Sequence, residues 1–196
     1  MEITMAYKVE VGISNKHVHL SEADLAALFG AGHKLTVKKM LKQPGQYASE
    51  ELVDVVGPKG TLKGMRVLGP VRKESQVELA VTDARGIGLT PPVRESGVLD
   101  GTPGVKLIGP AGEVNLSKGV IIALRHIHLS SSEARDAGVK DKDRVTVKTF
   151  GSRPLIFEDV LVRAGDAYLR EFHVDTDEGN AAGITNGDMV EITGKK

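Results

Sequence analysis

The chain repeats itself around two short histidine motifs. Residues 13–21 and 122–130 align with five identities in nine positions, and both copies contain His-x-His followed by Leu-Ser. In each copy an apolar run precedes the histidines, and a helical segment follows them before a similar run, at 35–38 and at 145–148. A weaker repeat relates residues 137–147 to 182–192, with four identities in eleven positions. Internal repetition of this kind predicts two related units, and a pseudo-twofold arrangement would bring the two histidine motifs together.

Short runs rich in Val, Ile and Leu alternate with turn residues along the whole chain. The 23 Gly and 8 Pro are spread throughout it, as in Gly57-Pro58, Gly69-Pro70 and Gly109-Pro110. This pattern is typical of β-strands in a barrel or sandwich. Two short helices are expected, one from Ser21 to Gly30 and one from Ser130 to Gly138, because each begins with a capping serine and ends at glycine. The sequence therefore predicts a mainly β protein with a few capping helices.

Composition excludes several classes of function. The 26 basic and 26 acidic residues cancel, and the chain has only three Tyr, four Phe and no Trp, which argues against a nucleic-acid partner. No apolar run approaches the roughly 20 residues needed to span a membrane. The absence of Cys excludes disulfides, thiolate zinc sites, iron–sulfur clusters and a Cys nucleophile. Residues 1–7 lack the basic and apolar segments of a signal peptide, so we expect a cytoplasmic protein.

The two His-x-His pairs, His17/His19 and His126/His128, are the strongest chemical signal. Residues i and i+2 of a strand point to the same face, about 7 Å apart, so two imidazoles can converge on one ion. Neutral imidazole is the commonest metal-binding side chain. Because the motif recurs at equivalent positions of a repeat, it favours metal sites over pairs of core or surface histidines.

Each pair of histidines needs a further ligand to complete a metal site. Glu78 shares one face of an alternating run with Gln76 and Ala80, and it could be a ligand or an ordinary edge-strand charge. His173 could be a ligand, although a surface or core role is the commoner fate of such a residue. His33 follows a helix that ends at glycine and is expected to be a solvated loop residue.

Basic residues near these motifs indicate an anionic substrate. Arg72 follows Gly69-Pro70, and Arg94 precedes Ser96-Gly97. A guanidinium presents a planar set of donors that fits phosphate, and a hydroxyl or backbone amide can complete the site. Lys38 is instead expected on a solvated face. The chain contains no P-loop, no Gly-x-Gly-x-x-Gly after a strand and no nucleophilic serine elbow.

Five separated segments together resemble the PduL-type phosphate propanoyltransferase (phosphotransacylase) family. They are SNKHVHLS at 14–21, LGPVRKESQVE at 68–78, PVRESG at 92–97, RHIHL at 125–129 and FHVDTDEGNAA at 172–182. The resemblance implies two β-barrel domains related by internal duplication and capped by short helices. Domain 1 would comprise residues 6–15 plus 100–193, domain 2 would comprise residues 16–99, and the active site would lie between them.

The resemblance also assigns site residues. It implies two divalent metal ions, normally zinc, one held by His17, His19 and Glu78 and the other by His126, His128 and His173. Arg72 would be the catalytic residue and would bind phosphate together with Ser96. Contacts to coenzyme A would come from Ser14, Lys39, Arg66, Leu68, His173 and Asn180.

The implied reaction is acyl-CoA plus phosphate giving acyl phosphate plus CoA, in either direction, with propanoyl-CoA or acetyl-CoA as the substrate. Without a Cys nucleophile, direct metal-assisted attack of phosphate on the thioester is simpler than a covalent acyl-enzyme. Two alternatives stay open: a metal-dependent hydrolase that uses water at the same residues, and a non-catalytic barrel with structural metal. Structural zinc usually has four protein ligands, whereas each ion here would have three, which argues against the non-catalytic alternative.

The expected partners are small-molecule substrates, together with a further copy of the chain in a homo-oligomer, for which a dimer is the common default. Family members packaged in bacterial microcompartments carry an amphipathic N-terminal extension. Only about a dozen residues precede the first motif here, which argues against association with a microcompartment shell.

Overall fold

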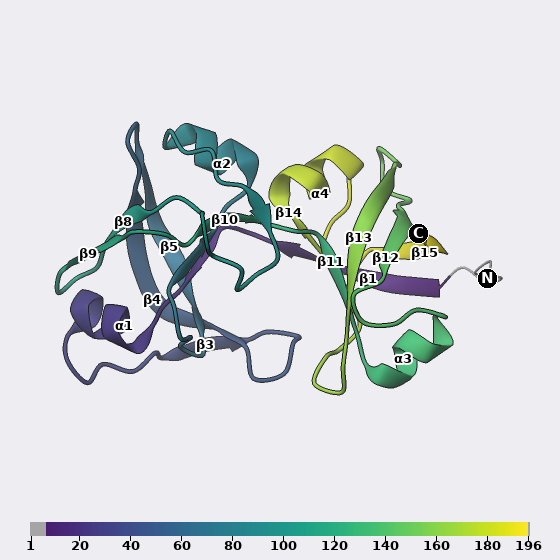
Figure 1. The fold of residues 1–196 in the computed structure, drawn as a ribbon, viewed down its shortest axis with the longest axis horizontal. Coiled ribbons are helices and arrows are strands. Elements are labelled where there is room, and N and C mark those ends of the chain that lie inside the picture. The colour runs from purple at the N-terminus through teal and green to yellow at the C-terminus, as the bar shows by residue number, and fades with distance from the viewer. Residues whose placement is uncertain (1–6, 196) are drawn as a thin grey trace. The chain divides into compact units, whose positions relative to one another are not determined.

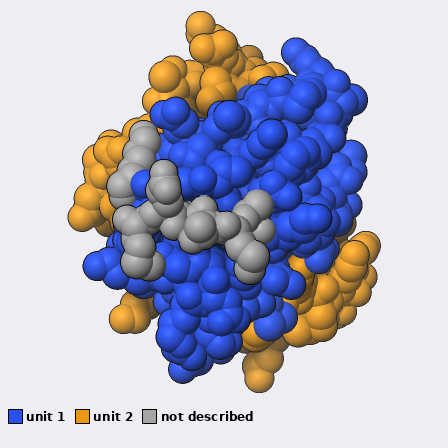
Figure 2. Space-filling view, turned by 90° about the vertical axis from the view of Figure 1, so that its right-hand side faces the viewer, with its two compact units in different colours: residues 1–14, 124–196 blue, residues 15–123 orange. Residues whose placement is uncertain are grey.

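A computed structural model describes residues 7–195, so residues 1–6, including the predicted domain start at residue 6, lie outside the described part. The chain forms two compact units (Figure 2). Among the described residues, unit 1 contains 7–14 and 124–195, and unit 2 contains 15–123. Both are built mainly from strands, with short helices beside them (Figure 1), which confirms the predicted fold class.

Unit 1 is a closed barrel of six strands. Its core is a cluster of apolar side chains that includes Ile127 and Phe172, both fully buried. Helices α3 (Ser131–Asp136) and α4 (Thr176–Ala182) lie on opposite sides of the barrel (Figure 1). In barrel order the strands are β1 (Tyr7–Ser14), β14 (Glu171–Asp175), β11 (His126–Leu129), β13 (Ile156–Ala164), β12 (Arg144–Lys148) and β15 (Met189–Lys195).

Unit 2 is a curled, half-closed sheet of nine strands with its own apolar core. Helices α1 (Glu22–Phe29) and α2 (Val81–Gly86) belong to this unit. The strands follow the order β7 (Val93–Arg94), β10 (Val120–Ala123), β6 (Gln76–Glu78), β2 (His17–His19), β5 (Thr61–Gly69), β4 (Tyr47–Val56), β8 (Val105–Ile108) and β9 (Glu113–Leu116), and β3 (Val37–Met40) pairs with β4.

The boundary between the units differs from the predicted domain boundary. The prediction assigned residues 100–123 to domain 1, whereas the compact units divide between Ala123 and Leu124. The reason is strand pairing: β8 pairs with β4, and β10 pairs with β6, so both strands complete the sheet of unit 2.

The strand before each His-x-His motif belongs to the other unit. Strand β1 is part of the unit 1 barrel and leads into β2 of unit 2, whereas β10 is part of unit 2 and leads into β11 of unit 1. Each histidine strand is then followed by a serine-capped helix, α1 after Ser21 and α3 after Ser130, as predicted. The repeat in the sequence is therefore also a repeat in the structure.

A second structural correspondence was not apparent from the sequence alignment. Strand β6 leads into α2, and β14 leads into α4. The basic residue that precedes each His-x-His forms an ion pair with the third residue of the corresponding helix: Lys16 with Asp83 at 2.8 Å, and Arg125 with Glu178 at 2.9 Å. A basic residue and the acidic residue that it pairs with thus hold equivalent positions in the two units.

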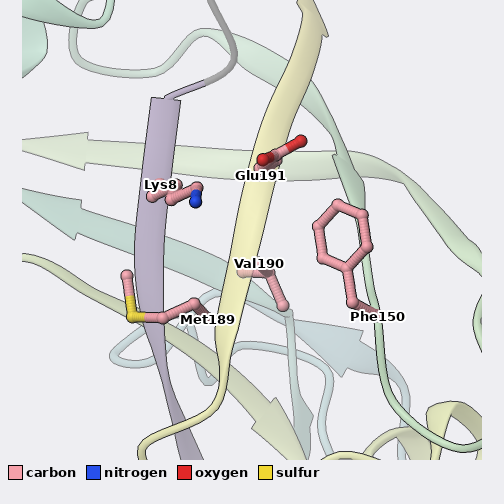
Figure 3. A pocket seen from close by; sticks show the side chains of 5 residues that line it. All are labelled: Lys8, Phe150, Met189, Val190 and Glu191. Carbon is pink, nitrogen blue, oxygen red and sulfur yellow. The ribbon is translucent and has the colours of Figure 1, made fainter.

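Two further features of the fold bear on function: the character of its helices and a depression on its surface. None of the helices in the described part of the chain has the length and hydrophobicity that crossing a bilayer requires. A depression on the unit 1 barrel is lined by Lys8, Phe150, Met189, Val190 and Glu191 (Figure 3). None of these five residues is a predicted site residue, and none is a histidine.

We expect equivalent core leucines of the two units to be equally important for stability. Leu20 and Leu129 hold the same position in the repeat and are both fully buried. Replacing either with Ala should lower the free energy of unfolding by about 2–5 kcal/mol, because a cavity remains where the side chain packed. Urea denaturation measures this loss. Leu52→Ala, at a 41% exposed position of β4, is the control and should change stability by less than about 0.5 kcal/mol.

Candidate functional site

The structure brings six predicted ligand residues into two groups of three. One group in unit 2 contains His17, His19 and Glu78, and the other in unit 1 contains His126, His128 and His173. Within each group the potential ligand atoms all lie within 4.8 Å of one another. Each group therefore has the residue types and the spacing that could hold one metal ion.

Strand alternation explains why these side chains meet. In β2 the two histidines occupy one face while Val18, between them, packs into the core on the other. Antiparallel pairing then places Glu78 of β6 directly opposite His17. In unit 1 the corresponding pairing of β11 with β14 places His173 opposite His126. The third member of each group thus comes from the neighbouring strand.

In unit 2 the imidazole Nε2 atoms face one carboxylate oxygen. Glu78 Oε1 lies 3.5 Å from His17 Nε2 and 3.7 Å from His19 Nε2. The Nδ1 atoms contact backbone carbonyls, that of His17 at Asn15 (2.8 Å) and that of His19 at Leu68 (3.2 Å). Because a carbonyl only accepts, Nδ1 carries the proton in each neutral ring and the Nε2 lone pair faces Glu78. Metal-binding histidines are commonly oriented in this way.

Electrostatics favour an ionised glutamate in this group. Burial would raise the pKa of Glu78, but the adjacent His17 and His19, with Arg72, hold it well below its usual range. Burial and the nearby His17 lower the pKa of His19 to about 3. Burial also disfavours the charged form of His17, yet the Glu78 carboxylate raises the pKa of that ring overall. The group combines an anionic oxygen with at least one neutral imidazole.

The unit 1 group consists of three closely packed imidazoles. Their ring centroids are 4.7–4.9 Å apart, and His126 Nδ1 contacts the Leu124 carbonyl at 2.8 Å, two residues back, just as His17 contacts Asn15. Tyr168 stacks on His128 with 4.4 Å between ring centroids. Burial and the neighbouring rings lower the pKa of His128 to about 2. This ring is therefore neutral, and one of its nitrogens can offer a lone pair to a metal ion.

Buried nitrogen atoms in this group have no hydrogen-bond partner in the protein. They are Nδ1 and Nε2 of His128 and Nε2 of His173. Leaving a buried polar atom unsatisfied costs about 1–3 kcal/mol, so such atoms normally have a function. One nitrogen of the neutral His128 ring carries a proton; the other, together with His173 Nε2, could donate a lone pair to a divalent ion. Both groups therefore fit a metal of the kind that binds imidazole and carboxylate, such as zinc.

Arg72 and Ser96 lie beside the unit 2 group. Arg72 Nη1 donates to Ser96 Oγ at 3.1 Å, and Ser96 Oγ donates to Glu78 Oε1 at 3.1 Å. The backbone N–H of Arg72 donates to the Leu20 carbonyl at 2.8 Å, which ties the arginine to the end of the His-x-His segment. The two predicted phosphate ligands are thus in contact with each other and with a candidate metal ligand.

Gln76 was not among the predicted site residues, yet it contacts both Glu78 and Ser96. Its fully buried amide donates to Glu78 Oε1 at 2.5 Å and to Ser96 Oγ at 2.8 Å, and it accepts from the Gly97 N–H at 2.8 Å. These three bonds orient the carboxylate and the hydroxyl together. The available signal was its position on the same strand face as Glu78, two residues away.

The residues predicted to contact coenzyme A are divided between the units. Ser14, His173 and Asn180 belong to unit 1, where Ser14 ends β1 and Asn180 is exposed on α4. The other three belong to unit 2: Lys39 is exposed on β3, Arg66 donates to the Ser49 carbonyl at 2.8 Å, and the Leu68 carbonyl contacts His19. These six positions remain predictions.

A family model described as phosphate propanoyltransferase matches residues 10–185 of the chain. This match spans both histidine groups, Arg72 and Ser96.

Individual relatives extend over nearly the same range. A phosphate propanoyltransferase of Thermotoga maritima is 58% identical over 183 residues, which cover 93% of this chain and 87% of the relative. A phosphate propanoyltransferase of Rhodopseudomonas palustris is 48% identical over 189 residues, covering 96% and 84%. One of Clostridioides difficile is 46% identical over 187 residues, covering 95% and 90%. Each relative therefore aligns with nearly the whole of this chain.

The sixth histidine, His33, has a structural partner in unit 2. Its Nε2 lies 3.0 Å from Oε1 of the buried Glu51, and its ring stacks on Phe29. Both Glu51 oxygens also accept from the Thr36 N–H at 3.0 Å. His33 is half-buried and bonded to Glu51, so it differs from the solvated residue we expected. Burial opposes ionisation of Glu51, but His33 and the backbone donors lower its pKa overall.

We expect the Glu51 contacts to stabilise the fold only while the carboxylate is charged. Because the folded pKa is below the unfolded value, this stabilisation is present above about pH 4.5 and disappears as the pH falls through the folded pKa. Glu51→Gln should therefore lower the free energy of unfolding by about 1–3 kcal/mol at neutral pH, and by much less near the acid limit of folding.

Urea denaturation across this pH range measures the difference. The matched control is Glu50→Gln on the same strand, whose half-exposed carboxylate pairs with Lys38. Surface pairs of this kind contribute about 0–1 kcal/mol. An equal loss of stability from Glu51→Gln at every pH would contradict the prediction.

Proposed function

The chain belongs to the phosphate propanoyltransferase family, and from this premise we propose that it interconverts a short-chain acyl-CoA and phosphate with acyl phosphate and CoA. The acyl group would be propanoyl or acetyl, which differ by one methylene. One observation carries the proposal: Arg72 and Ser96, a pair of donors suited to an anion, contact the group formed by His17, His19 and Glu78.

The cofactors would be two divalent metal ions, with zinc as the proposed identity. His17, His19 and Glu78 would hold one ion, and His126, His128 and His173 the other. The convergence of their ligand atoms supports this, as do the buried nitrogens of His128 and His173 that make no hydrogen bond. When bound, such an ion would supply Lewis-acid polarisation of the thioester carbonyl and stabilise the departing thiolate.

Arg72 would bind and orient phosphate. A guanidinium can donate two parallel hydrogen bonds to phosphate oxygens, and the Ser96 hydroxyl adds a donor. The bond between Arg72 and Ser96 holds both groups in place before the substrate arrives, so little reorganisation is needed. The backbone tie of Arg72 to Leu20 keeps this arginine close to the histidine strand.

The proposed chemistry is a direct exchange at the thioester carbonyl. A phosphate oxygen forms a bond to the carbonyl carbon, the carbon–sulfur bond breaks, and the sulfur leaves with the electron pair as the CoA thiolate. Arg72 would partly neutralise the phosphate and fix the direction of its approach. Coenzyme A itself would be bound by Ser14, Lys39, Arg66, Leu68, His173 and Asn180. We also propose a free cytoplasmic enzyme acting on small molecules.

Hydrolysis of the thioester by water is the competing reaction for the same residues. Nothing in that reaction needs an anion-binding arginine and serine next to the glutamate, whereas phosphate transfer does. The contact between Arg72 and Ser96 therefore favours the transferase.

The function predicts that CoA release requires phosphate. With metal-loaded protein and propanoyl-CoA or acetyl-CoA, free thiol should appear only when phosphate is added, and acyl phosphate should form in equal amount. Treatment with a chelator should abolish the release, and added zinc should restore it. Thiol release at the same rate without phosphate would instead identify a hydrolase, and no release from either substrate would remove the proposed activity.

Arg72→Ala should lower kcat/KM by about 10²- to 10³-fold, equivalent to about 2.7–4 kcal/mol, by analogy with loss of one positioned donor. The KM for phosphate should rise more than the KM for acyl-CoA, because only phosphate loses a partner. Arg85→Ala, at an exposed position on α2, removes the same charge from the same unit and is the control. Turnover of the Arg72→Ala protein at the control's rate would remove Arg72 from the site.

A further inference from the structure

Three of the four rings in the two His-x-His motifs are oriented by a backbone carbonyl. Nδ1 of each of these rings, His17, His19 and His126, lies 2.8–3.2 Å from one such oxygen. The fourth ring, His128, differs: within the described residues neither of its nitrogens has a hydrogen-bond partner, although the residue is only 5% exposed. A metal-binding histidine normally has a second contact that fixes the orientation of its ring. In His128 this contact has to be of another kind.

The ring of Tyr168 lies flat against His128. The angle between the two ring planes is 5°, and the centroids are 4.4 Å apart. His128 meets the rings of His126 and His173 at steep angles instead, 64° and 67°. Stacked aromatic rings attract each other and restrict each other's rotation, because tilting either ring reduces the contact. The stack with Tyr168 therefore sets the plane in which the His128 imidazole lies.

Tyr168 is itself held in place beside the histidine strand. Arg163 lies directly opposite His128 in the pairing of β13 with β11, and its Nη2 donates to the Tyr168 hydroxyl at 3.2 Å. The Arg163 guanidinium also lies 5.5 Å from the centre of the tyrosine ring. The Tyr168 N–H donates to the Gly165 carbonyl at 3.0 Å, and the Gly165 N–H donates to the Leu129 carbonyl at 3.0 Å. These contacts anchor the tyrosine to the residue that follows His128.

Comparison of the two units shows what this arrangement replaces. In unit 2 the ring equivalent to His128 is His19, and the neighbouring parallel strand β5 orients it through the Leu68 carbonyl. In unit 1 the neighbouring parallel strand is β13, and it acts through the side chain of Arg163, which holds Tyr168. Corresponding strands thus orient the second histidine of each motif with different chemical groups.

We propose that Tyr168 is a positioning residue for the unit 1 metal site, where its stacked ring holds His128 in the orientation that binds the ion shared with His126 and His173. This proposal rests on the metal sites of the proposed function. The stack restricts the plane of His128 without using either nitrogen, so one nitrogen is left for the ion while the other carries the proton. Arg163 acts one contact further out, through the tyrosine hydroxyl.

The test isolates each metal site within the full-length chain. A His17→Ala/His19→Ala background retains only the unit 1 site, and a His126→Ala/His128→Ala background retains only the unit 2 site. Co²⁺ is titrated into the metal-free proteins, and its affinity comes from competition with a chromophoric chelator. The d–d absorption bands report the geometry of the ligands.

Three variants separate the tyrosine ring from its hydroxyl and from aromatic residues in general. Tyr168→Ala removes the ring, and Tyr168→Phe removes only the hydroxyl. Phe150→Ala removes a 54% exposed ring elsewhere on the same barrel and is the matched control (Figure 3).

In the first background, Tyr168→Ala should weaken Co²⁺ binding by roughly 10- to 100-fold, the range for outer partners of metal ligands, and should change the d–d spectrum. Tyr168→Phe should keep the parent spectrum and most of the affinity, because it keeps the stacked ring. Phe150→Ala should change neither property. In the second background Tyr168→Ala should also change neither, since the unit 2 site has no contact with this ring.

A second measurement on the metal-free protein tests the stack without any ion. The Tyr168 ring current should shift the NMR signals of the His128 ring protons, which a His128→Ala variant identifies, and Tyr168→Ala should remove this shift. If Tyr168→Ala does not fold by circular dichroism, Tyr168→Leu, which keeps an apolar side chain but no ring, replaces it in both measurements.

The outcomes distinguish this proposal from the proposed function. Unchanged Co²⁺ affinity and spectrum in folded Tyr168→Ala or Tyr168→Leu protein would overturn the role of Tyr168 alone, as would the absence of the ring-current shift. A loss in Tyr168→Phe as large as that in Tyr168→Ala would overturn the role of the stacked ring. Failure of the first background itself to bind Co²⁺ would overturn the unit 1 ion, and with it both that part of the proposed function and the positioning role.

Discussion

The arrangement of this protein depends on the alternation of side chains along paired strands. Every strand that contributes to a histidine group has apolar residues on one face and polar ones on the other, as with Val77 between Gln76 and Glu78. A shift of one residue in the pairing of β2 with β6 would move Glu78 away from His17 and bury its charge in the core. The hydrophobic core therefore specifies the register, and the register brings the potential ligands together.

Local sequence patterns were sufficient for the parts of the site that are close together in the chain. The paired histidines, the serine caps of α1 and α3 and the repeat itself could all be read from neighbouring residues. The third residue of each group could not, because Glu78 and His173 reach their histidines through cross-strand pairing between distant segments. Their assignment came from resemblance to a family. Gln76 was not predicted although it lies two residues from Glu78, because its hydrogen bonds to Ser96 and Gly97 join segments that are distant in the chain.

The duplication has produced two similar frameworks with different chemistry. In unit 2 the nitrogens of His17 and His19 face the Glu78 carboxylate, which is hydrogen-bonded to Gln76 and Ser96. In unit 1 the group consists of three imidazoles and contains no carboxylate. The strands, the helices and the basic residue before each His-x-His motif correspond between the two units. The third residue of each histidine group differs, being Glu78 in unit 2 and His173 in unit 1. The repeat predicted two units, but neither local propensity nor periodicity indicates which sheet a strand joins. The grouping of β1 with the C-terminal half was expected only from the family resemblance, and the place of β10 in unit 2 was not foreseen.

The position of β1 sets an order for synthesis and folding. Its neighbours in the barrel are β14 and β15, so nearly the whole chain has to be made before β1 can pair. All the strands of unit 2 are synthesised earlier, and that sheet can form first. Until the barrel closes, the nascent chain exposes the unpaired backbone groups of β1 and the apolar Val9 and Val11, which are later buried. This first strand is therefore the segment most in need of protection from aggregation while the protein is being made.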